Sequence, residues 1–355
     1  EAIMFPTFDG HNDLLLRLQT HPEKRDEIWL TGEGVGHLDL PRMKQGGFAA
    51  GFFAIYIPSP VSHDAPDYMD AMENPPFNLP LGDLITDETA LPIAFSMAAH
   101  LLWMERSSNG AFKVCRTVAE IRDCMAKGVI AGIMHMEGAE AIDASLNNLY
   151  AFHAMGLRSI GPVWSRPTIF GHGVPFAYPS GPDTGEGLTE AGKRLVLACN
   201  ELNIMLDLSH INEKGFNDVA RLSNAPLVAT HSNAHAVTPS SRNLTDRQLA
   251  MIRESNGMVG LNFATSFLRR DGKQSADMGW EDVLRHLDHL LAHLGEDHLG
   301  LGSDFDGATL PQGIGDVTGL PALQQAMIDH GYGAALMKKL CHDNWLALLD
   351  RTWAA

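Results

Sequence analysis

The strongest constraint on the fold is an alternation along the whole chain, in which short β-rich runs are separated by helical stretches. This alternation is typical of a parallel sheet whose strands are joined by crossover helices. Strands are expected at 3–11, 46–57, 129–137, 157–164, 203–210, 225–232, 257–263 and 298–305. Helices are expected at 87–107, 117–127, 144–155, 189–202, 212–223, 245–254, 280–294 and 333–350. Eight strands can close on themselves, so the sequence predicts an α/β fold of the (β/α)8, or TIM barrel, type.

The 355 residues are expected to form one domain, 1–355, because barrels of this type reach such a length as a single unit. Hydrophobic residues make up 45% of the chain and supply ample material for a core. We find no internal repeat, low-complexity tract or interdomain linker in the sequence. Two Pro/Gly-rich stretches, 58–86 and 165–187, are long for loops of a compact domain and predict lids or binding loops.

The charge balance excludes one class of partner. The chain carries 43 acidic and 26 basic residues, a formal net charge of −17, whereas nucleic-acid binding requires a basic surface. No apolar run reaches the ~18 residues of a membrane-spanning helix. We therefore expect neither a nucleic-acid partner nor a membrane partner.

The four cysteines, at 115, 124, 199 and 341, show no C-x-x-C spacing. In a chain of this length they are interpreted as buried or free thiols in a reducing compartment, which predicts a cytoplasmic protein. A Cys115–Cys124 bridge is the alternative. The first residues lack the basic start and apolar run of a signal peptide, but a removed leader stays open because the sequence does not begin with Met.

Residues that bind metals or move protons recur where the expected strands end. They are His11 and Asp13 after the first strand, Glu137 at the third, His210 at the fifth, His231 at the sixth, and Asp304 and Asp306 at the eighth. In a (β/α)8 barrel the carboxyl ends of all strands open onto one face, where such enzymes hold their catalytic groups. The barrel would therefore bring together side chains that are hundreds of positions apart.

The chemistry of this set indicates zinc. In His11-x-Asp13, residues i and i+2 of an extended chain point to the same side, so both side chains can hold one ion. Three imidazoles and two carboxylates match the ligands that zinc prefers. A single glutamate is bidentate and can bridge two ions, so Glu137 would suffice for a site with two zinc ions per chain.

Other candidates are weaker. His135, His153 and His172 lack the shared placement, and His286, His289 and His293 fall at helical spacing with Asp282, which predicts a solvated helix face. Ser209 and Ser232 lie beside histidines without the G-x-S-x-G context of a serine hydrolase. The glycine-rich segments GEGVG and GIGDVTG do not connect a strand to a helix, so they are poor phosphate-binding candidates.

Five motifs together resemble the renal (membrane) dipeptidase family of zinc-dependent dipeptidases, which have an amidohydrolase-like barrel. They are FDGHND, HMEG, LDLSH, ATHSNA followed by SSRN, and GLGSDFDG, and they occur in the family's order between about residues 5 and 350. Each motif alone is weak, but the set is highly specific. The resemblance implies a (β/α)8 barrel with a binuclear zinc site that hydrolyses dipeptides, some of them with a D-residue at the C-terminal position.

The resemblance also assigns roles. It implies that His11 and Asp13 hold one zinc ion, that His210 and His231 hold the second, and that Glu137 bridges the two. Arg242, in SSRN, matches the arginine that binds the carboxylate of the dipeptide, a task suited to a bidentate guanidinium. Asp304 matches the acid/base residue that takes a proton from the attacking water and passes it to the leaving amine.

The chain departs from the family at two points. Family members place a histidine after the fourth strand, where it stabilises the developing oxyanion, whereas this chain has Trp164, whose indole offers one N–H donor. Either the oxyanion depends more on zinc, or another donor, such as His172 on the 165–187 loop, replaces the histidine. Moreover, no cysteine falls in the SRPT or AVTP segments, where disulfide-bonded secreted members carry them.

Two other functions stay open. One is hydrolysis of another small amide, such as a lactam or an acyl-amino acid, which the change to Trp164 allows. The other is a catalytically silent barrel that binds a metal or a small molecule. Asp304 favours an enzyme, because a silent protein has no need of a carboxylate aimed at the metals. The sequence leaves the oligomeric state open, with a homodimer as one candidate assembly.

Overall fold

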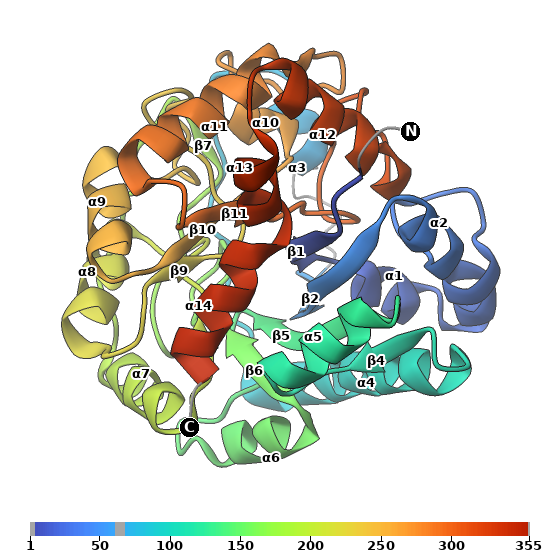
Figure 1. Ribbon diagram of the computed structural model, residues 1–355. Helices are drawn as coiled ribbons and strands as arrows, with labels where there is room; N and C mark the ends of the chain where they lie inside the picture. The colour runs from blue at the N-terminus through green and yellow to red at the C-terminus, as the bar shows by residue number, and fades with distance from the viewer. Residues whose placement is uncertain (1–3, 61–67, 354–355) are drawn as a thin grey trace.

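The computed structural model describes residues 4–60 and 68–353. Its central feature is a parallel barrel surrounded by helices (Figure 1). In the described part of the chain the barrel strands are β1 (Thr7–Asn12), β2 (Phe48–Tyr56), β5 (Ile130–Glu137), β6 (Leu157–Ile160), β8 (Met205–Leu206), β9 (Val228–Ala229), β10 (Met258–Leu261) and β11 (Leu299–Leu301). Their order is β8-β6-β5-β2-β1-β11-β10-β9. A parallel bridge between Asp207 and Val228 brings the two ends of this order together, so the predicted (β/α)8 barrel is confirmed.

Helices alternate with these strands. Those that cover the barrel are α1 (Leu14–Thr20), α4 (Asp87–Ser107), α5 (Val118–Ala126), α6 (Asn147–Met155), α7 (Glu190–Glu201), α8 (Glu213–Leu222), α9 (Asp246–Glu254), α11 (Trp280–Leu294) and α14 (Asn344–Trp353). Shorter helical elements are α2 (Leu40–Gln45), α3 (Tyr68–Met72), α10 (Thr265–Leu268), α12 (Leu320–Asp329), α13 (Ala334–Lys338), η1 (Pro22–Lys24), η2 (Glu27–Thr31), η3 (Val317–Gly319) and η4 (Lys339–Asp343). The sequence did not predict α1, α2 or α12, and the helix expected at 333–350 is divided between α13, η4 and α14.

Several helices begin at side-chain caps. The hydroxyls of Thr117, Thr189 and Thr245 accept hydrogen bonds from backbone N–H groups three residues later, which satisfies donors that have no partner inside the helix. At Thr245 the Gln248 side chain also accepts a hydrogen bond from the Thr245 backbone N–H, which completes a capping box. These caps fix where α5, α7 and α9 start, and hence where the preceding loops must end.

The amino end of the barrel is closed by apolar packing. Trp345 of α14 stacks on Phe8 at 5.8 Å between ring centroids, meets Phe52 edge-on at 5.5 Å, and donates its indole N–H to the Leu301 carbonyl at 3.0 Å. A Cβ at Gly10 would lie 2.7 Å from the Trp345 ring, so only glycine allows this approach. Figure 1 shows α14 running across the barrel strands. Aromatic side chains thus fill this end around the fully buried Trp345.

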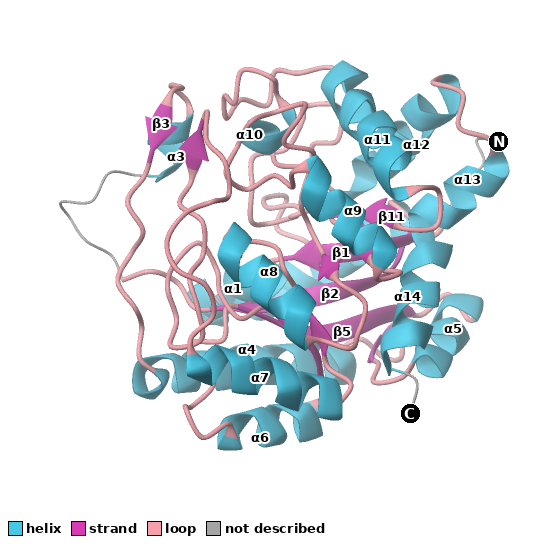
Figure 2. Ribbon diagram, turned by 90° about the vertical axis from the view of Figure 1, so that its left-hand side faces the viewer, coloured by secondary structure: helices cyan, strands magenta, loops and turns pink. Residues whose placement is uncertain are grey.

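The loops gather on the side opposite α14 (Figure 2). There the two long stretches predicted as lids contact each other, because β3 (Phe77–Asn78) pairs antiparallel with β7 (Ala177–Tyr178). Residues 61–67 of the first stretch lie outside the described residues. A further short strand, β4 (Phe112–Val114), pairs with β5 outside the barrel order.

Candidate active site

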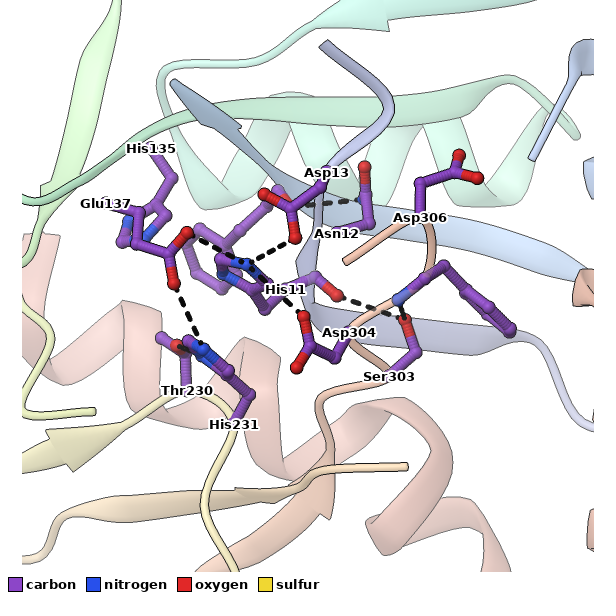
Figure 3. Close-up of polar contacts among 12 residues, drawn as sticks. His11, Asn12, Asp13, His135, Glu137, Thr230, His231, Ser303, Asp304 and Asp306 are labelled. Atoms are coloured by element: carbon purple, nitrogen blue, oxygen red, sulfur yellow. Dashed lines mark hydrogen bonds and ion pairs between the residues drawn. The ribbon is translucent and has the colours of Figure 1, made fainter. Parts of the chain in front are cut away.

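The strand ends bring the five predicted metal ligands together. His11 and Asp13 stand at the end of β1, Glu137 is the last residue of β5, and His210 and His231 follow β8 and β9. All five are buried. Their ligand atoms form two groups, each within 4.8 Å: His11, Asp13 and Glu137, and Glu137, His210 and His231. Figure 3 shows how His11, Asp13, Glu137 and His231 point toward one another.

The two oxygens of Glu137 face different groups. Oε2 lies 3.6 Å from His11 Nε2, which is also 3.2 Å from Asp13 Oδ2. Oε1 lies 2.9 Å from His210 Nε2 and 3.3 Å from His231 Nε2. One carboxylate is thus divided between two sets of nitrogen and oxygen atoms, which is the arrangement that a bridging ligand requires.

The hydrogen bonds of His231 determine which of its nitrogens carries the proton. The Thr230 hydroxyl donates to Asp207 Oδ2 at 2.6 Å, so it must accept from His231 Nδ1 at 2.8 Å. Because burial lowers the pKa of His231 well below its ordinary value, the ring is neutral and Nε2 carries a lone pair. That lone pair faces the Glu137 carboxylate and lies 3.2 Å from His210 Nε2. A cation between them would remove the repulsion, so the donor set fits a metal ion.

The remaining members also suit a cation. Burial lowers the pKa of His210 well below its ordinary value, and its Nδ1 is 2.8 Å from the Ser165 hydroxyl. Burial raises the pKa of Glu137 well above its ordinary range; His11 opposes this effect, and Asp13 and Asp304 add to it. Burial lowers the pKa of His11, but the charges of Glu137 and Asp13 outweigh it and hold that pKa well above its ordinary value. The carboxylates therefore attract positive charge at this point.

Asp304 enters the site from the loop after β11. Its Oδ1 lies 3.9 Å from His11 Nε2, and its Oδ2 accepts a hydrogen bond from Asn262 Nδ2 at 3.0 Å. Burial raises the pKa of this carboxyl, against the lowering effect of His11. A Cβ at Gly307 would come within 2.4 Å of Asp304 Oδ1, so glycine is needed for the loop to pass this close.

Backbone strain accompanies two of these residues. His210 has φ of 71° and Asp304 has φ of 60°, in the left-handed region that residues with a Cβ rarely adopt. Such conformations persist where the surrounding structure enforces them, and they concentrate at functional sites. By contrast, the carboxylate of Asp306, with φ of 65°, accepts hydrogen bonds from Arg17 at 3.0 Å and from the His37 N–H at 2.6 Å. Asp306 thus holds the loop after β11 against Arg17 and His37.

Arg242 is buried beside the metal ligands. Its Nη2 donates to the His231 carbonyl at 3.1 Å, and its guanidinium lies 5.2 Å from the centre of the Phe267 ring. Burial lowers the pKa of Arg242, and the charges of Asp304 and Glu137 oppose that effect. Phe267 borders the adjoining cavity, whereas Arg242, the predicted carboxylate-binding residue, is not among the described residues that line it.

A cavity of about 300 Å³ opens above the ligands. Its lining combines acidic and imidazole groups of the site with apolar walls: Asp13, Leu16, Tyr56, Tyr68, Met69, Met72, Glu137, Trp164, Phe176, His210, Ala264, Ser266, Phe267, Gln274, Asp304, Asp306, Gly307 and Ala308. Trp164 lines this cavity, and its part in substrate binding stays a prediction. Among the described residues that line it, His172 is not found, and its proposed use as a donor stays a prediction.

Sequence reasoning missed Tyr56 and Asn262 and set His135 aside as a weaker candidate. Tyr56 ends β2 and Asn262 follows β10, so both stand at strand ends, a signal that we applied only to metal-binding residue types. His135, whose ring centroid is 5.7 Å from that of His11, lies two residues before Glu137 on β5 and so points to the same side. Strand-end position, applied to every polar residue, would have found the first two.

The prediction of a solvated face on α11 was wrong for His286. This residue is fully buried, its Nδ1 accepts from the Ala234 N–H at 3.1 Å, and its Nε2 lies 3.0 Å from the Leu268 carbonyl. His289 and His293 are partly exposed and face Asp246 of α9. Spacing along one helix identifies a face but does not show which segment covers it.

Comparisons with known proteins agree with this geometry. The family model for membrane dipeptidases (peptidase family M19) matches residues 2–354. The crystal structure of a metallo peptidase from Rhodobacter sphaeroides, with a phosphinate mimic of the dipeptide L-Ala-D-Ala, has a TM-score of 0.97 and 72% identity, covering 99% of this chain and 100% of that one. The crystal structure of a dipeptidase of family M19 has the same TM-score and coverage, with 71% identity. An uncharacterized protein of Klebsiella pneumoniae is 46% identical, over 74% of this chain and 97% of its own length.

Two further predictions concern the surroundings of the protein. All four cysteines are buried and free, with Cys115 Sγ 3.7 Å from Cys124 Sγ, so the bridge considered as an alternative is absent. Within residues 4–60 and 68–353, no helix combines the length and the apolar character that crossing a membrane requires.

Proposed function

Because the chain belongs to the membrane dipeptidase family, peptidase family M19, we propose that it hydrolyses dipeptides with two zinc ions held by His11, Asp13, Glu137, His210 and His231. The observation that carries the proposal is the division of the Glu137 carboxylate, with one oxygen toward His11 and the other toward His210 and His231. Two zinc ions bound here would supply Lewis acidity that lowers the pKa of a water toward neutrality and polarises the scissile carbonyl.

The proton transfers are assigned to Asp304. Asn262 holds Oδ2, which leaves Oδ1 directed toward His11 and the centre of the site. Asp304 takes the proton of the attacking water and delivers it to the leaving amine, so that the C–N bond breaks with a neutral amine as product. A carboxylate that is buried and whose pKa is raised is suited to both steps.

Substrate binding is assigned to Arg242 and the cavity walls. The Arg242 guanidinium would hold the free carboxylate of the dipeptide, and its charge lies close to the acidic groups of the site. The cavity volume, about 300 Å³, is at the lower end for small-molecule sites and favours short peptides. We include L,D-dipeptides among the substrates, since the Rhodobacter sphaeroides structure at 72% identity holds a mimic of L-Ala-D-Ala.

Metal analysis and a substrate screen test the proposal together. The purified protein, reconstituted with zinc and freed of excess ion, should contain about two zinc ions per chain. It should hydrolyse dipeptides from a panel that pairs L,L with L,D forms and adds lactams and acyl-amino acids. Turnover confined to the last two classes would replace dipeptides by another small amide, and metal binding without any turnover would identify a silent barrel.

The proposal also covers the compartment, the domain organisation and the oligomeric state. Four buried free cysteines favour a reducing compartment, and so a cytoplasmic protein. The family model covers almost the whole chain, which supports one domain over 1–355. A homodimer stays a prediction, and the molar mass in solution tests it.

A further inference from the structure

Trp164 forms a wall of the cavity. Its ring meets Tyr56 edge-on at 5.1 Å between centroids, meets Phe176 at 5.5 Å, and lies 5.8 Å from the His210 ring. These contacts use the apolar area of the indole. With Trp164 acting as a wall, a side-chain donor for the developing oxyanion would have to come from another residue that lines the cavity.

The position of Tyr56 makes it the best-placed substitute. Of the hydroxyl-bearing residues that line the cavity, Tyr68 and Ser266 belong to α3 and α10, outside the barrel, whereas Tyr56 ends a barrel strand. Tyr56 is paired directly with Glu137 in the β2–β5 ladder, which places the two backbones on adjacent strands, about 4.8 Å apart. The phenol is therefore anchored next to the carboxylate that both ligand groups share.

A buried ion pair holds Tyr56 and Trp164 together. Arg166, two residues after Trp164, lies with its guanidinium carbon 6.0 Å from the Tyr56 ring centre and 5.3 Å from the Trp164 ring centre. Its Nη2 is 2.7 Å from Glu140 Oε1, and both side chains are almost completely buried. Arg166 also donates to the Ile57 carbonyl at 2.8 Å, directly after Tyr56. The phenol is thus held by groups that do not move with the substrate.

The phenol is also in the correct protonation state. Burial raises the pKa of Tyr56, and the charges of Glu137 and Asp13 add to this effect, whereas Arg166 and a hydrogen bond with the Ser59 side chain oppose it. Ser59 Oγ in turn accepts a hydrogen bond from Arg166 at 2.9 Å. Tyr56 therefore keeps its proton at neutral pH and is available as a hydrogen-bond donor.

From this placement we propose that the Tyr56 hydroxyl donates a hydrogen bond to the carbonyl oxygen of the scissile peptide as that oxygen gains negative charge. Tyr56 would thus fill the role that the resemblance gives to a histidine at the position of Trp164. The phenol keeps its proton throughout, so no covalent step is added. The inference rests on the proposed dipeptidase function and names a further catalytic residue for it.

Tyr56→Phe tests the hydroxyl alone, because the ring and its contacts with Trp164 and Arg166 are retained. We expect kcat on L-Ala-D-Ala to fall by ~10²-fold with KM little changed, since a donor used only in the transition state is lost. The dissociation constant of a phosphinate mimic of the same dipeptide, measured by calorimetry on the zinc-loaded protein, should rise by a comparable factor. Zinc content and melting temperature should stay at the wild-type values.

Tyr150→Phe is the matched control, because Tyr150 is exposed on α6 and its hydroxyl should contribute nothing to either measurement. Phosphinate affinity and kcat that are both unchanged in Tyr56→Phe would overturn the role of Tyr56. A rise in KM with unchanged kcat would also overturn it, because the hydroxyl would then only bind the ground state. If the unaltered enzyme hydrolyses no dipeptide, the proposed function fails first; turnover with an unimpaired Tyr56→Phe removes the Tyr56 assignment alone.

Discussion

The two ends of the barrel are built from the same strands and differ completely in what they bury. At the amino end, Phe8 of β1 and Phe52 of β2 pack on Trp345 of α14. At the carboxyl end, three residues further along β1, His11 faces Asp13 and Glu137. One end removes apolar surface from water, which stabilises the fold directly. The other buries charged and polar groups, which costs free energy unless a partner compensates.

This difference indicates that the amino ends of the strands mainly stabilise the fold, whereas their carboxyl ends carry the functional groups. The amino end needs no ion, because its contacts are complete: even the Trp345 indole N–H has a carbonyl partner. The carboxyl end is incomplete without a cation, because the Glu137 carboxylate and the unprotonated Nε2 of His231 face each other. Substitutions at the two ends should therefore produce opposite patterns: loss of activity with the fold retained, or loss of stability with the site retained.

Glu137→Ala should have the largest effect. Removing the shared carboxylate takes one ligand from each group, so we expect bound zinc to fall from about two ions per chain to below one and turnover to drop by ~10³ or more. Elemental analysis and steady-state kinetics on L-Ala-D-Ala measure both effects. Two firmly bound ions in this variant would show that Glu137 is not the bridge.

Trp345→Ala tests the opposite end. Truncating a large, fully buried side chain should lower the free energy of unfolding by ~3–5 kcal/mol. Zinc content and kcat measured well below the new melting temperature should change by less than about twofold. Trp103→Ala is the matched control, since Trp103 is only partly buried and stacks on Arg25, and it should cost ~1 kcal/mol. Denaturant titration compares the two, and equal losses would contradict the importance assigned to the amino end.

Asp304→Asn should separate proton transfer from metal binding within the carboxyl end. The amide is nearly isosteric with the carboxylate but does not accept a proton, so turnover should fall by ~10² or more while zinc content and melting temperature are retained. Loss of zinc would instead make Asp304 a ligand, in line with its place beside His11 and His231. Activity near that of the parent would remove it from the mechanism.

The sequence predicted the barrel and its ligand set because both depend on local patterns. Each strand run is apolar and ends at a chemically distinctive residue, so His11, Glu137 and His231 could be assigned to one face. Even β8 and β9, which form only two ladder residues each, were located by their flanking runs. The ligand roles themselves stay predictions, which the Glu137 and Asp304 variants test.

The sequence could not predict contacts made by distant segments. The burial of His286 depends on Ala234 and Leu268, which reach it from other loops. The pairing of β3 with β7 joins two stretches about a hundred residues apart that show no pattern of their own. Tyr56 is one of several aromatic residues in the sequence, and only its register opposite Glu137 makes it a candidate donor. Such features depend on how distant segments pack together, and the periodicity of the sequence does not predict them.

Trp164→His should have the smallest effect and addresses the departure from the family. In the structure Trp164 contacts Tyr56, Phe176 and His210 as a wall, so the smaller imidazole would leave a gap and remove apolar contact with the substrate. A loss of ~1.4 kcal/mol of binding free energy, typical for part of an aromatic contact, corresponds to a KM about tenfold higher with kcat little changed.

Steady-state kinetics of Trp164→His and His172→Ala on L-Ala-D-Ala show whether Trp164 acts as a wall and whether His172 acts as the donor. A clear gain in kcat for Trp164→His would show that the family donor had been missing and is restored, which would weaken the case for Tyr56. A large loss of kcat in His172→Ala would bring that residue back as the donor, although it does not line the described cavity. If Trp164→His changes only KM, the chemistry of the carboxyl end resides in the metal ligands, Asp304 and Tyr56. The departure from the family at Trp164 then affects only the shape of the cavity wall.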